Sequence, residues 1–332
     1  MESVRNLLDL SKVGRSLWER YGTPAKLENA RRLRAQSAAC VEVVEAYPWR
    51  VVLEPANYCN LRCKACPTRE SELPKGMLDP AQLERYLHDL WPFLVQVNVF
   101  NWGEPFLNLR LPEVVAVIHS HGVGTHVHSN MNRLPRNLPE SLVDAELDFL
   151  VASIDGVTQD VYARYREGGS CRQALKNLAE FVNIRHARAA TSPKIIWRYL
   201  CFPHNLHQIE EAARLAREIG ADDFAVAEGN LDGQTWTPEG PKPIAARGRD
   251  EPPPYCTDLY DFPIIHWDGT VLPCCYATDS CFVWGDLKTS AWPEAFNTTT
   301  FQTARRLARG DQSARGPCTG CFKIPPAVEL RA

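Results

Sequence analysis

The sequence predicts an α/β fold: a partial (β/α)6 barrel of the TIM type, followed by a small C-terminal α+β module. Three observations predict this fold. Six short apolar runs alternate with helical segments between residues 50 and 230, which is typical of parallel β/α units. A stretch rich in proline and glycine interrupts the alternation at residues 231–254. A hairpin motif and a closely spaced pair of cysteines then follow, which indicates a second, smaller unit.

Composition limits the possible partners of this chain. It has 332 residues, of which 45% are hydrophobic, so it can bury one large core with or without a smaller module. Its 37 basic and 40 acidic residues nearly balance, so we expect a small-molecule partner and neither nucleic acid nor a membrane surface. The absence of a targeting segment and of a long apolar run predicts a cytoplasmic protein. In that reducing compartment, twelve cysteines favour metal ligation over disulfides.

Residues 1–48 are expected to form an N-terminal helical extension. Apolar residues recur there at three- and four-residue spacing, which is typical of an amphipathic helix. We expect this segment to pack against the barrel or bind a partner, and assign no chemistry to it.

The barrel is predicted over residues 49–230. Its strands are expected at residues 50–55, 95–101, 123–129, 149–154, 194–201 and 223–227. Right-handed crossovers would curl these units into a partial barrel. Active groups in such barrels gather at the C-terminal ends of the strands, so those ends are where functional residues are sought.

Two helices between the strands have recognisable ends. Asp79 is the expected N-cap of one helix, with Pro80 at its first position and Gln82 at the capping-box position. Gly220 is expected to end another helix, which carries an apolar face over residues 206–219.

Three cysteines follow the first predicted strand directly. Cys59, Cys63 and Cys66 have the spacing C-x3-C-x2-C. Three thiolates fit a cubane [4Fe-4S] cluster with one iron left open, because such clusters are normally held by four cysteines. A zinc site, which prefers four ligands, and a disulfide framework are the alternatives. The spacing favours the cluster.

This motif resembles that of the radical S-adenosylmethionine (radical SAM) enzymes, in which the open iron binds SAM. Ala65 stands where the family usually has an aromatic residue. After the second predicted strand, Gly103 and Glu104 resemble the family's G-G-E-P motif, which holds the SAM ammonium, although Trp102 replaces the first glycine. The resemblance therefore implies a SAM site at the ends of the first two strands.

Polar residues at later strand ends continue the resemblance. They are implied to meet the ribose and the carboxylate of SAM: Ser129, Asn130, Ser153 and Asp155. Arg166, or alternatively Arg164, could pair with that carboxylate through its planar fork. Each match alone is weak, because such residues are common in ordinary turns. Several in chain order, at successive strand ends, are a much stronger indication.

Beyond a proline-rich linker or lid at residues 231–254, residues 255–332 are predicted to form the second module. Apolar runs at 261–267 and 270–274 flank Asp268-Gly269, which predicts a hairpin with a type I′ turn. The module's cysteines include Cys256, Cys274, Cys318 and Cys321. Their arrangement resembles the twitch domain, the short relative of the SPASM extension of radical SAM enzymes, which implies one auxiliary [4Fe-4S] cluster. A zinc ion held by four cysteines is the alternative.

The resemblance to twitch-domain aminocyclitol dehydrogenases and aminoglycoside epimerases implies a radical SAM oxidoreductase or epimerase. Such an enzyme would abstract hydrogen from a carbohydrate or aminocyclitol carbon through a 5′-deoxyadenosyl radical, and its auxiliary cluster would transfer electrons. The implied cofactors are two [4Fe-4S] clusters and SAM. The implied partners are a sugar or aminocyclitol substrate and a reducing electron donor such as flavodoxin or ferredoxin. A peptide-modifying enzyme and a non-catalytic iron-sulfur or zinc scaffold are the alternatives.

Cys201 closes the fifth predicted strand and is therefore expected at the mouth of the barrel. Epimerases of this group, by resemblance, finish by donating a thiol hydrogen, which makes Cys201 a candidate catalytic residue. Cys275 and Cys281 are competing donors. The alternative is a buried structural cysteine.

Overall fold

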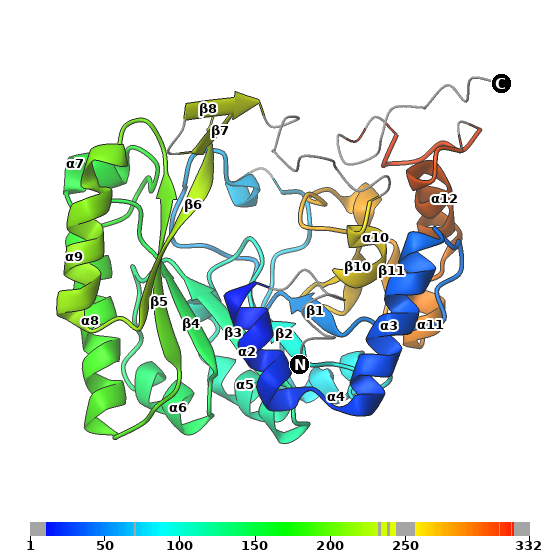
Figure 1. Ribbon diagram of the computed structural model, residues 1–332, viewed down its shortest axis with the longest axis horizontal. Coiled ribbons are helices and arrows are strands. Elements are labelled where there is room, and N and C mark those ends of the chain that lie inside the picture. The colour runs from blue at the N-terminus through cyan, green and yellow to red at the C-terminus, as the bar shows by residue number, and fades with distance from the viewer. Residues whose placement is uncertain are drawn as a thin grey trace.

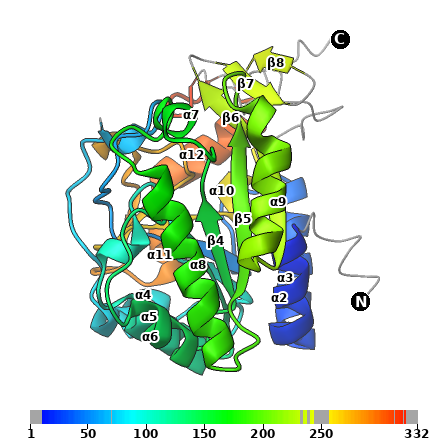
Figure 2. The ribbon, with the colours of Figure 1, turned by 90° about the vertical axis from the view of Figure 1, so that its left-hand side faces the viewer.

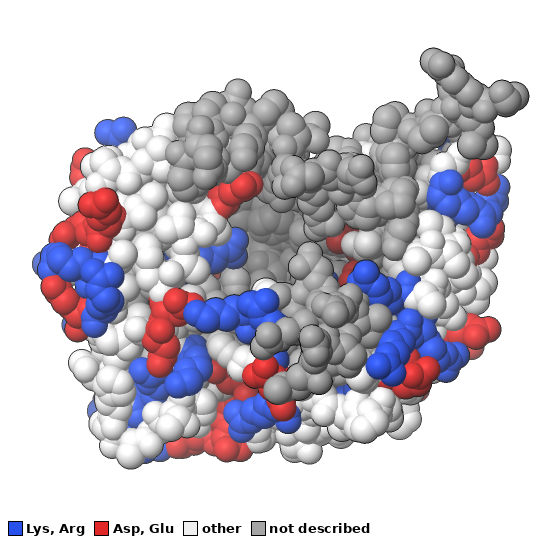
Figure 3. Space-filling view, viewed as in Figure 1, with Lys and Arg blue, Asp and Glu red and all other residues white. Residues whose placement is uncertain are grey.

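The computed structural model describes residues 11–69, 71–231, 234–237, 240–243, 256–311, 313–319 and 321, with the side chains of 230–243 excluded. Within these ranges, eleven strands form one sheet in the order β11-β10-β9-β1-β2-β3-β4-β5-β6-β7-β8. None of the helices described combines the length and the apolar character needed to cross a bilayer. Basic and acidic side chains alternate over the face in Figure 3 without a large patch of one sign, and the face is hollowed near its centre.

The predicted α/β barrel fold is confirmed. Six strands, each parallel to the next, form an open arc (Figure 1): β1 (Arg50–Leu53), β2 (Gln96–Asn98), β3 (Gly124–Ser129), β4 (Phe149–Ser153), β5 (Lys194–Cys201) and β6 (Asp223–Leu231). Helices cover the outer side of the arc (Figure 2): α5 (Leu111–Ser120), α6 (Leu138–Asp144), α7 (Gln159–Ala163), α8 (Cys171–Ala187) and α9 (Ile209–Ile219). The inner side of the arc, which these helices do not cover, is called the lumen below.

Strand alternation divides each barrel strand between core and lumen, because successive side chains point to opposite faces. In β5, Trp197 and Tyr199 are fully buried in the core that the helices share. The intervening Arg198 and Leu200 are only half-buried and face the lumen. The same alternation in β3 gives Val127 to the core and His126 and His128 to the lumen. The lumen is consequently lined in part by polar side chains.

Two helices lie within the predicted N-terminal extension: α2 (Lys12–Tyr21) and α3 (Pro24–Ala38). Residues 39–48, which were also expected to be helical, form turns and irregular structure. Ser11 caps α2 by accepting a hydrogen bond from the Gly14 N–H at 3.2 Å. Leu17 of α2 packs so close to Gly124 that a Cβ there would lie 2.5 Å from its side chain. Gly124 begins β3, so α2 covers the N-terminal end of the barrel. Residues 1–10 lie outside the described residues.

The expected helix ends are found, with one difference. Asp79 does act as an N-cap, but of the 3-10 turn η2 (Pro80–Gln82), where it accepts from the Ala81 N–H. The regular helix α4 (Leu83–Leu87) begins only after this turn. Gly220 ends α9 at a φ of 88°, as predicted, since this left-handed conformation suits glycine.

The C-terminal module continues the barrel sheet. Its elements are α10 (Asp258–Asp261), β9 (Ile264–Ile265), β10 (Thr270–Leu272), β11 (Gly285–Asp286), α11 (Trp292–Ala295) and α12 (Thr299–Ala308). Strand β9 pairs in parallel with β1, with Val52 opposite Ile264. This pairing covers an edge of the barrel sheet that would otherwise expose unpaired backbone groups. It also brings the module against the C-terminal end of β1.

The β9–β10 hairpin is confirmed, but its predicted type I′ turn is wrong. Such a turn needs positive φ at both central residues, and only Gly269 has it, at 85°. The Gly269 N–H donates to the His266 carbonyl, and the His266 N–H donates to the Thr270 carbonyl. The loop is therefore a type I turn followed by a left-handed glycine, the three-residue alternative to a type I′ hairpin.

Two unexpected strands lie within the predicted linker. β7 (Gln234–Thr237) and β8 (Gly240–Pro243) form an antiparallel hairpin that continues the sheet beyond β6. Prolines are tolerated in β8 because it is the last strand of the sheet, where one side makes no ladder bonds. The rest of the predicted linker lies outside the described residues, and the proposed domain boundaries stay predictions.

Candidate functional site

The cysteine loop leaves β1 and runs beside the segment that follows α7. The Arg62 N–H donates to the Glu167 carbonyl at 2.9 Å, and the Lys64 N–H donates to the Tyr165 carbonyl at 3.1 Å. These bonds hold the loop at the C-terminal ends of the strands. Ala65, which replaces an aromatic residue of the family motif, adopts a positive φ of 57°.

The three loop thiols lie among polar groups. Asn130 Nδ2 is 3.7 Å from Cys59 Sγ, and Arg166 Nη1 is 3.9 Å from Cys63 Sγ. Burial raises the pKa of the Cys59 thiol to about 12, and the nearby Cys63 and Cys66 thiols add to the rise. The three sulfurs are therefore neighbours. Asn130 and Arg166 can donate hydrogen bonds to two of them when the thiols are deprotonated. This donor set fits a cluster held by thiolates, whose properties depend on hydrogen bonds to sulfur.

A single ion fits the thiols less well. Four sulfurs around one zinc would lie about 3.8 Å apart, given a zinc–sulfur bond of about 2.3 Å. Among the residues that the structure describes, no three His, Cys, Asp or Glu side chains gather closely enough to hold one ion. A cubane cluster is larger than a single ion and spreads its ligands further apart.

Glu104 connects the turn after β2 with the end of β3 and with the cysteine loop that follows β1. Its carboxylate is buried and accepts hydrogen bonds from the Phe106 N–H at 3.0 Å and the Asn130 N–H at 2.8 Å. Its own N–H donates to the Tyr58 carbonyl at 2.7 Å. Burial raises the pKa of this carboxyl, while the two backbone donors oppose the rise. Glu104 thus joins the ends of β2 and β3 to the cysteine loop.

Gly103, next to Glu104, allows a close backbone approach. A Cβ at this position would lie 1.7 Å from the Ala56 carbonyl oxygen. We expect Gly103→Ala to displace the turn, to destabilise the fold by about 1–3 kcal/mol and to weaken SAM binding by about tenfold or more. Equilibrium dialysis with SAM and thermal unfolding measure these effects. The control is Gly316→Ala, where the nearest contact would be an ordinary 3.7 Å. Wild-type behaviour of Gly103→Ala would contradict the expected steric role.

The predicted SAM-binding residues of later strands lie at the C-terminal ends of the strands, and Arg166 is the basic residue among them. Arg166 Nε donates to Asp155 Oδ2 at 2.5 Å, and the Leu200 N–H donates to Asp155 Oδ1 at 2.7 Å. The Ser129 hydroxyl bonds to Glu104, and Ser153 is half-buried on the lumen side of β4. The other predicted candidate, Arg164, is exposed. Their contacts with SAM stay predictions.

A buried acid–histidine–acid cluster joins the barrel to the C-terminal module. His266 Nε2 lies 2.8 Å from Glu54 Oε2, and His266 Nδ1 lies 3.3 Å from Asp268 Oδ1. Glu54 ends β1, whereas His266 and Asp268 belong to the hairpin. Burial lowers the pKa of His266, but the hydrogen bonds to Asp268 and Glu54 outweigh it and raise the pKa to about 9. The sequence analysis missed this cluster, since its members only meet through the pairing of β9 with β1.

The raised pKa of His266 predicts a loss of stability in mildly alkaline solution. The imidazolium is favoured by folding, so its contribution is complete below the unfolded pKa near 6.5 and disappears as the pH rises through 9. The contribution is on the order of 3 kcal/mol. Thermal unfolding midpoints of wild type and His266→Gln, measured from pH 6 to pH 10, should converge as the pH rises.

His121→Gln is the matched control for this measurement, because His121 forms a similar contact with Glu84 at the surface. Its difference from wild type should stay small across the range. A difference between wild type and His266→Gln that does not change with pH would show that His266 is not held as an imidazolium.

Trp102, the residue that replaces a glycine of the family motif, bridges the two units. Its N–H donates to Glu54 Oε1 at 3.2 Å, and its indole Nε1 donates to the Cys275 carbonyl at 2.7 Å. Its own carbonyl accepts from Thr68 Oγ1, which lies 3.2 Å from Cys66 Sγ. The turn beside the cysteine loop is therefore fastened to the C-terminal module.

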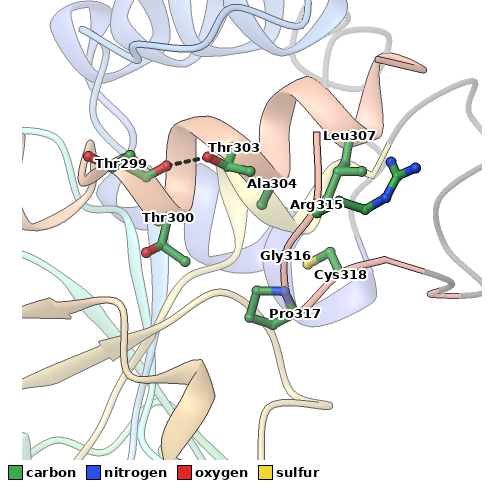
Figure 4. A pocket seen from close by; sticks show the side chains of 9 residues that line it. All are labelled: Thr299, Thr300, Thr303, Ala304, Leu307, Arg315, Gly316, Pro317 and Cys318. Carbon is green, nitrogen blue, oxygen red and sulfur yellow. Dashed lines mark hydrogen bonds between the residues drawn. The ribbon is translucent and has the colours of Figure 1, made fainter. Parts of the chain in front are cut away.

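The predicted auxiliary cysteines are also brought together in part. Burial raises the pKa of the Cys318 thiol to about 12, and neighbouring Cys321 and Cys256 add to the rise. Cys274 lies two residues beyond β10. A cavity of about 190 Å³ opens beside Cys318 (Figure 4), and it is lined by threonines and apolar side chains of α12 and by residues 315–318. The four-cysteine ligand set stays a prediction.

Cys201 does not face the lumen. It shares the outward side of β5 with Trp197 and Tyr199, and it is fully buried. Cys201 and Cys171, which begins α8, both lie near enough to Tyr199 to raise the pKa of its hydroxyl, so Cys201 lies on the helix side of the sheet. The sequence placed it correctly at the end of the strand but not on the side where the substrate would bind. This location is that of a packing residue and gives no support to hydrogen donation.

Two family models match the chain. One, described as the radical SAM superfamily, matches residues 53–236, and the other, described as an iron-sulfur cluster-binding domain of the SPASM type, matches residues 256–322. The match over the C-terminal module is thus to SPASM, of which twitch is the short relative.

Several curated proteins resemble part of the chain. Mycofactocin maturase MftC of Mycobacterium ulcerans is 26% identical over 163 residues, which are 49% of this chain and 42% of MftC. The probable GTP 3′,8-cyclase of Methanococcus maripaludis is 23% identical over 49% of this chain and 53% of that protein. The chain spans only about half, or less, of the length of these relatives.

Solved structures share the fold. Streptococcus suis SuiB bound to its precursor peptide SuiA superposes with a TM-score of 0.61 at 15% identity, over 90% of this chain and 75% of SuiB. BtrN in complex with AdoMet and 2-DOIA superposes with a TM-score of 0.50 at 15% identity, over 79% of this chain and 87% of BtrN. At such low identity these likenesses concern the fold alone.

Proposed function

This chain belongs to the radical SAM superfamily, and we propose that it is an oxidoreductase or epimerase acting on a hydroxylated carbon of a carbohydrate or aminocyclitol. Members of the superfamily are enzymes that use a [4Fe-4S] cluster with SAM, and SPASM domains carry additional iron-sulfur clusters. The class of reaction and the substrate go beyond the family match. The observation that carries them is the polar lining of the lumen, beside the predicted SAM site.

The lumen lining suits a small substrate rich in hydroxyl groups. Asn98 of β2 accepts hydrogen bonds from His126 at 3.1 Å and from Gln96 at 2.6 Å. His128 lies 3.0 Å from His126 and faces the same lumen. An apolar substrate would displace water from these polar groups without offering them hydrogen bonds in return. Burying polar groups in this way costs free energy. Donors and acceptors that are already positioned can instead hold hydroxyl groups in one orientation.

Each cluster has its own role in the proposal. Bound at Cys59, Cys63 and Cys66, the first cluster with SAM supplies a 5′-deoxyadenosyl radical that abstracts hydrogen from the substrate. Asp155, Arg166, Asn130 and the Glu104 turn hold SAM in place and exclude water around it. The second site is proposed to hold one [4Fe-4S] cluster on Cys256, Cys274, Cys318 and Cys321 and to transfer electrons. A donor such as flavodoxin or ferredoxin would reduce the protein.

The test uses anaerobically reconstituted protein, SAM and a chemical reductant. Deuterated sugars and aminocyclitols are added singly, and the 5′-deoxyadenosine formed is analysed for deuterium. Deuterium transfer from at least one of these compounds, with a product two hydrogens lighter or inverted at one carbon, supports the proposal. Transfer from a short peptide and from none of the sugars or cyclitols would overturn it.

Peptide modification is the second candidate function. MftC is named as a maturase and SuiB has been solved with a precursor peptide, and both resemble this chain in part. The described N-terminal residues, however, form helices α2 and α3 rather than a β-rich unit able to add a peptide as a strand. Copurification with a short peptide would favour this candidate, and the deuterium experiment separates it from the first.

A further inference from the structure

We propose that Arg198 binds an anionic group of the substrate, a carboxylate or a phosphate, within the barrel lumen, and that His128 accepts a hydrogen bond from a hydroxyl of the same substrate. The proposal rests on the proposed function and narrows its substrate to a sugar acid or a sugar phosphate. It is carried by the placement of Arg198 on β5 and by the lack of any partner for its guanidinium among the residues that the structure describes.

Arg198 faces the lumen because its neighbours Trp197 and Tyr199 are fully buried on the other side of the strand. It lies opposite Ser153 of β4 in the parallel register. Among the described residues, no carboxylate lies within ion-pair distance of its guanidinium and no hydrogen bond to it is found. The charge of Asp155 acts on Arg198, but this carboxylate is already paired with Arg166 at 2.5 Å.

An arginine in such surroundings attracts an anion. Burial lowers the pKa of Arg198. The negative charge of Asp155 opposes this shift, and the positive charge of Arg166 adds to it. The guanidinium remains charged, since its ordinary pKa is far above neutrality. A carboxylate or phosphate would supply the missing partner, and the planar fork of arginine binds either group with two parallel hydrogen bonds.

The two histidines beside Arg198 are neutral. Burial lowers the pKa of His126 to about 3 and that of His128 well below its usual value, and Arg198 contributes to both shifts. His126 Nδ1 donates to Asn98, so its Nε2 accepts from His128 Nε2, which lies 3.0 Å away. This assignment leaves His128 Nδ1 as an acceptor, and the ring is held by stacking on Phe100 at 3.8 Å between centroids. A substrate hydroxyl can donate to that nitrogen.

The carboxylate of SAM is the other possible source of an anion. Arg166 is better placed for it, because Arg166 approaches Cys63 and thereby the cysteine loop. The charge of Arg198 acts on both His126 and His128, whereas that of Arg166 acts on His128 alone. Because Arg166 lies beside the cysteine loop and is already paired with Asp155, we assign Arg166 to SAM and Arg198 to the substrate.

The experiment measures chemical modification of Arg198 rather than turnover. Anaerobic holoprotein is treated with phenylglyoxal, and modified arginines are located by peptide mass spectrometry. Glucuronate and glucose 6-phosphate are the anionic probes, glucose is the neutral probe and SAM is tested separately. Exposed Arg172 of α8 is the control within the same molecule. Both acids should slow modification of Arg198 by about tenfold, an effect worth about 1.4 kcal/mol of binding, whereas glucose and SAM should not.

Several results would overturn the proposal: an Arg198 that does not react, equal protection by glucose, protection by SAM alone, or protection by neither acid. Arg198→Gln should also bind glucuronate no better than glucose, and Arg198→Lys should restore part of the preference, because the charge is kept but the fork is lost. A failure of this kind is distinct from a failure of the proposed function. A neutral sugar could still deliver deuterium to 5′-deoxyadenosine although Arg198 bound no anion.

Discussion

Replacing Cys59, Cys63 and Cys66 together by alanine is expected to remove about half of the iron and all SAM cleavage. Two cubane clusters would correspond to about eight irons per chain, and these three thiols are proposed to hold one of them. The proposed SAM site surrounds the open iron of that cluster, so the remaining protein should keep about four irons and lose the reaction entirely. Iron analysis and the formation of 5′-deoxyadenosine measure the two effects.

Cys40→Ala is the control, since Cys40 lies between the N-terminal helices and β1, outside both cysteine sets. This variant should keep both iron and activity. An intact protein that binds only about four irons, with zinc at the remaining site, would contradict the two-cluster interpretation. Complete loss of iron from the triple variant would instead show that the second site depends on the first.

Cys318→Ala is expected to separate SAM cleavage from product formation. Cys318 is half-buried beside Cys321 and Cys256, and none of the contacts that fasten the cysteine loop to residues 165–167 involves it. SAM cleavage should therefore persist in part. Product should fall to the limit of detection, because the proposed electron transfer through the second cluster would be lost. SAM cleavage and product formation are measured in the same reaction by quantifying 5′-deoxyadenosine and the product.

The exposed Cys281 gives the matched control for this variant. Cys281→Ser should retain iron and product if four other cysteines hold the cluster. Undiminished product from Cys318→Ala would show that the second site is dispensable. Loss of SAM cleavage as well would mean that the module helps to build the first site through Trp102 and His266.

The sequence alone was sufficient to predict features that depend on residues close together in the chain. Alternation of apolar runs predicted the six barrel strands, and the loop spacing of Cys59, Cys63 and Cys66 predicted a set of neighbouring thiols. Gly220 was recognised because its left-handed conformation is a property of one residue. The type I′ turn at Gly269 was not correct, since the same two residues also suit a three-residue loop with a single left-handed position.

What the sequence by itself determined is thus the order of the strands, the polar residues at their ends and the position of each cysteine set along the chain. Only the tertiary structure decided which side of β5 bears Arg198 and which bears Cys201, because the face of a strand depends on where the helices pack. Only the pairing of β9 with β1 brought His266 to Glu54 and the Trp102 indole to the Cys275 carbonyl, 173 positions away in the chain. Such contacts depend on long-range strand pairing, and no local propensity encodes them.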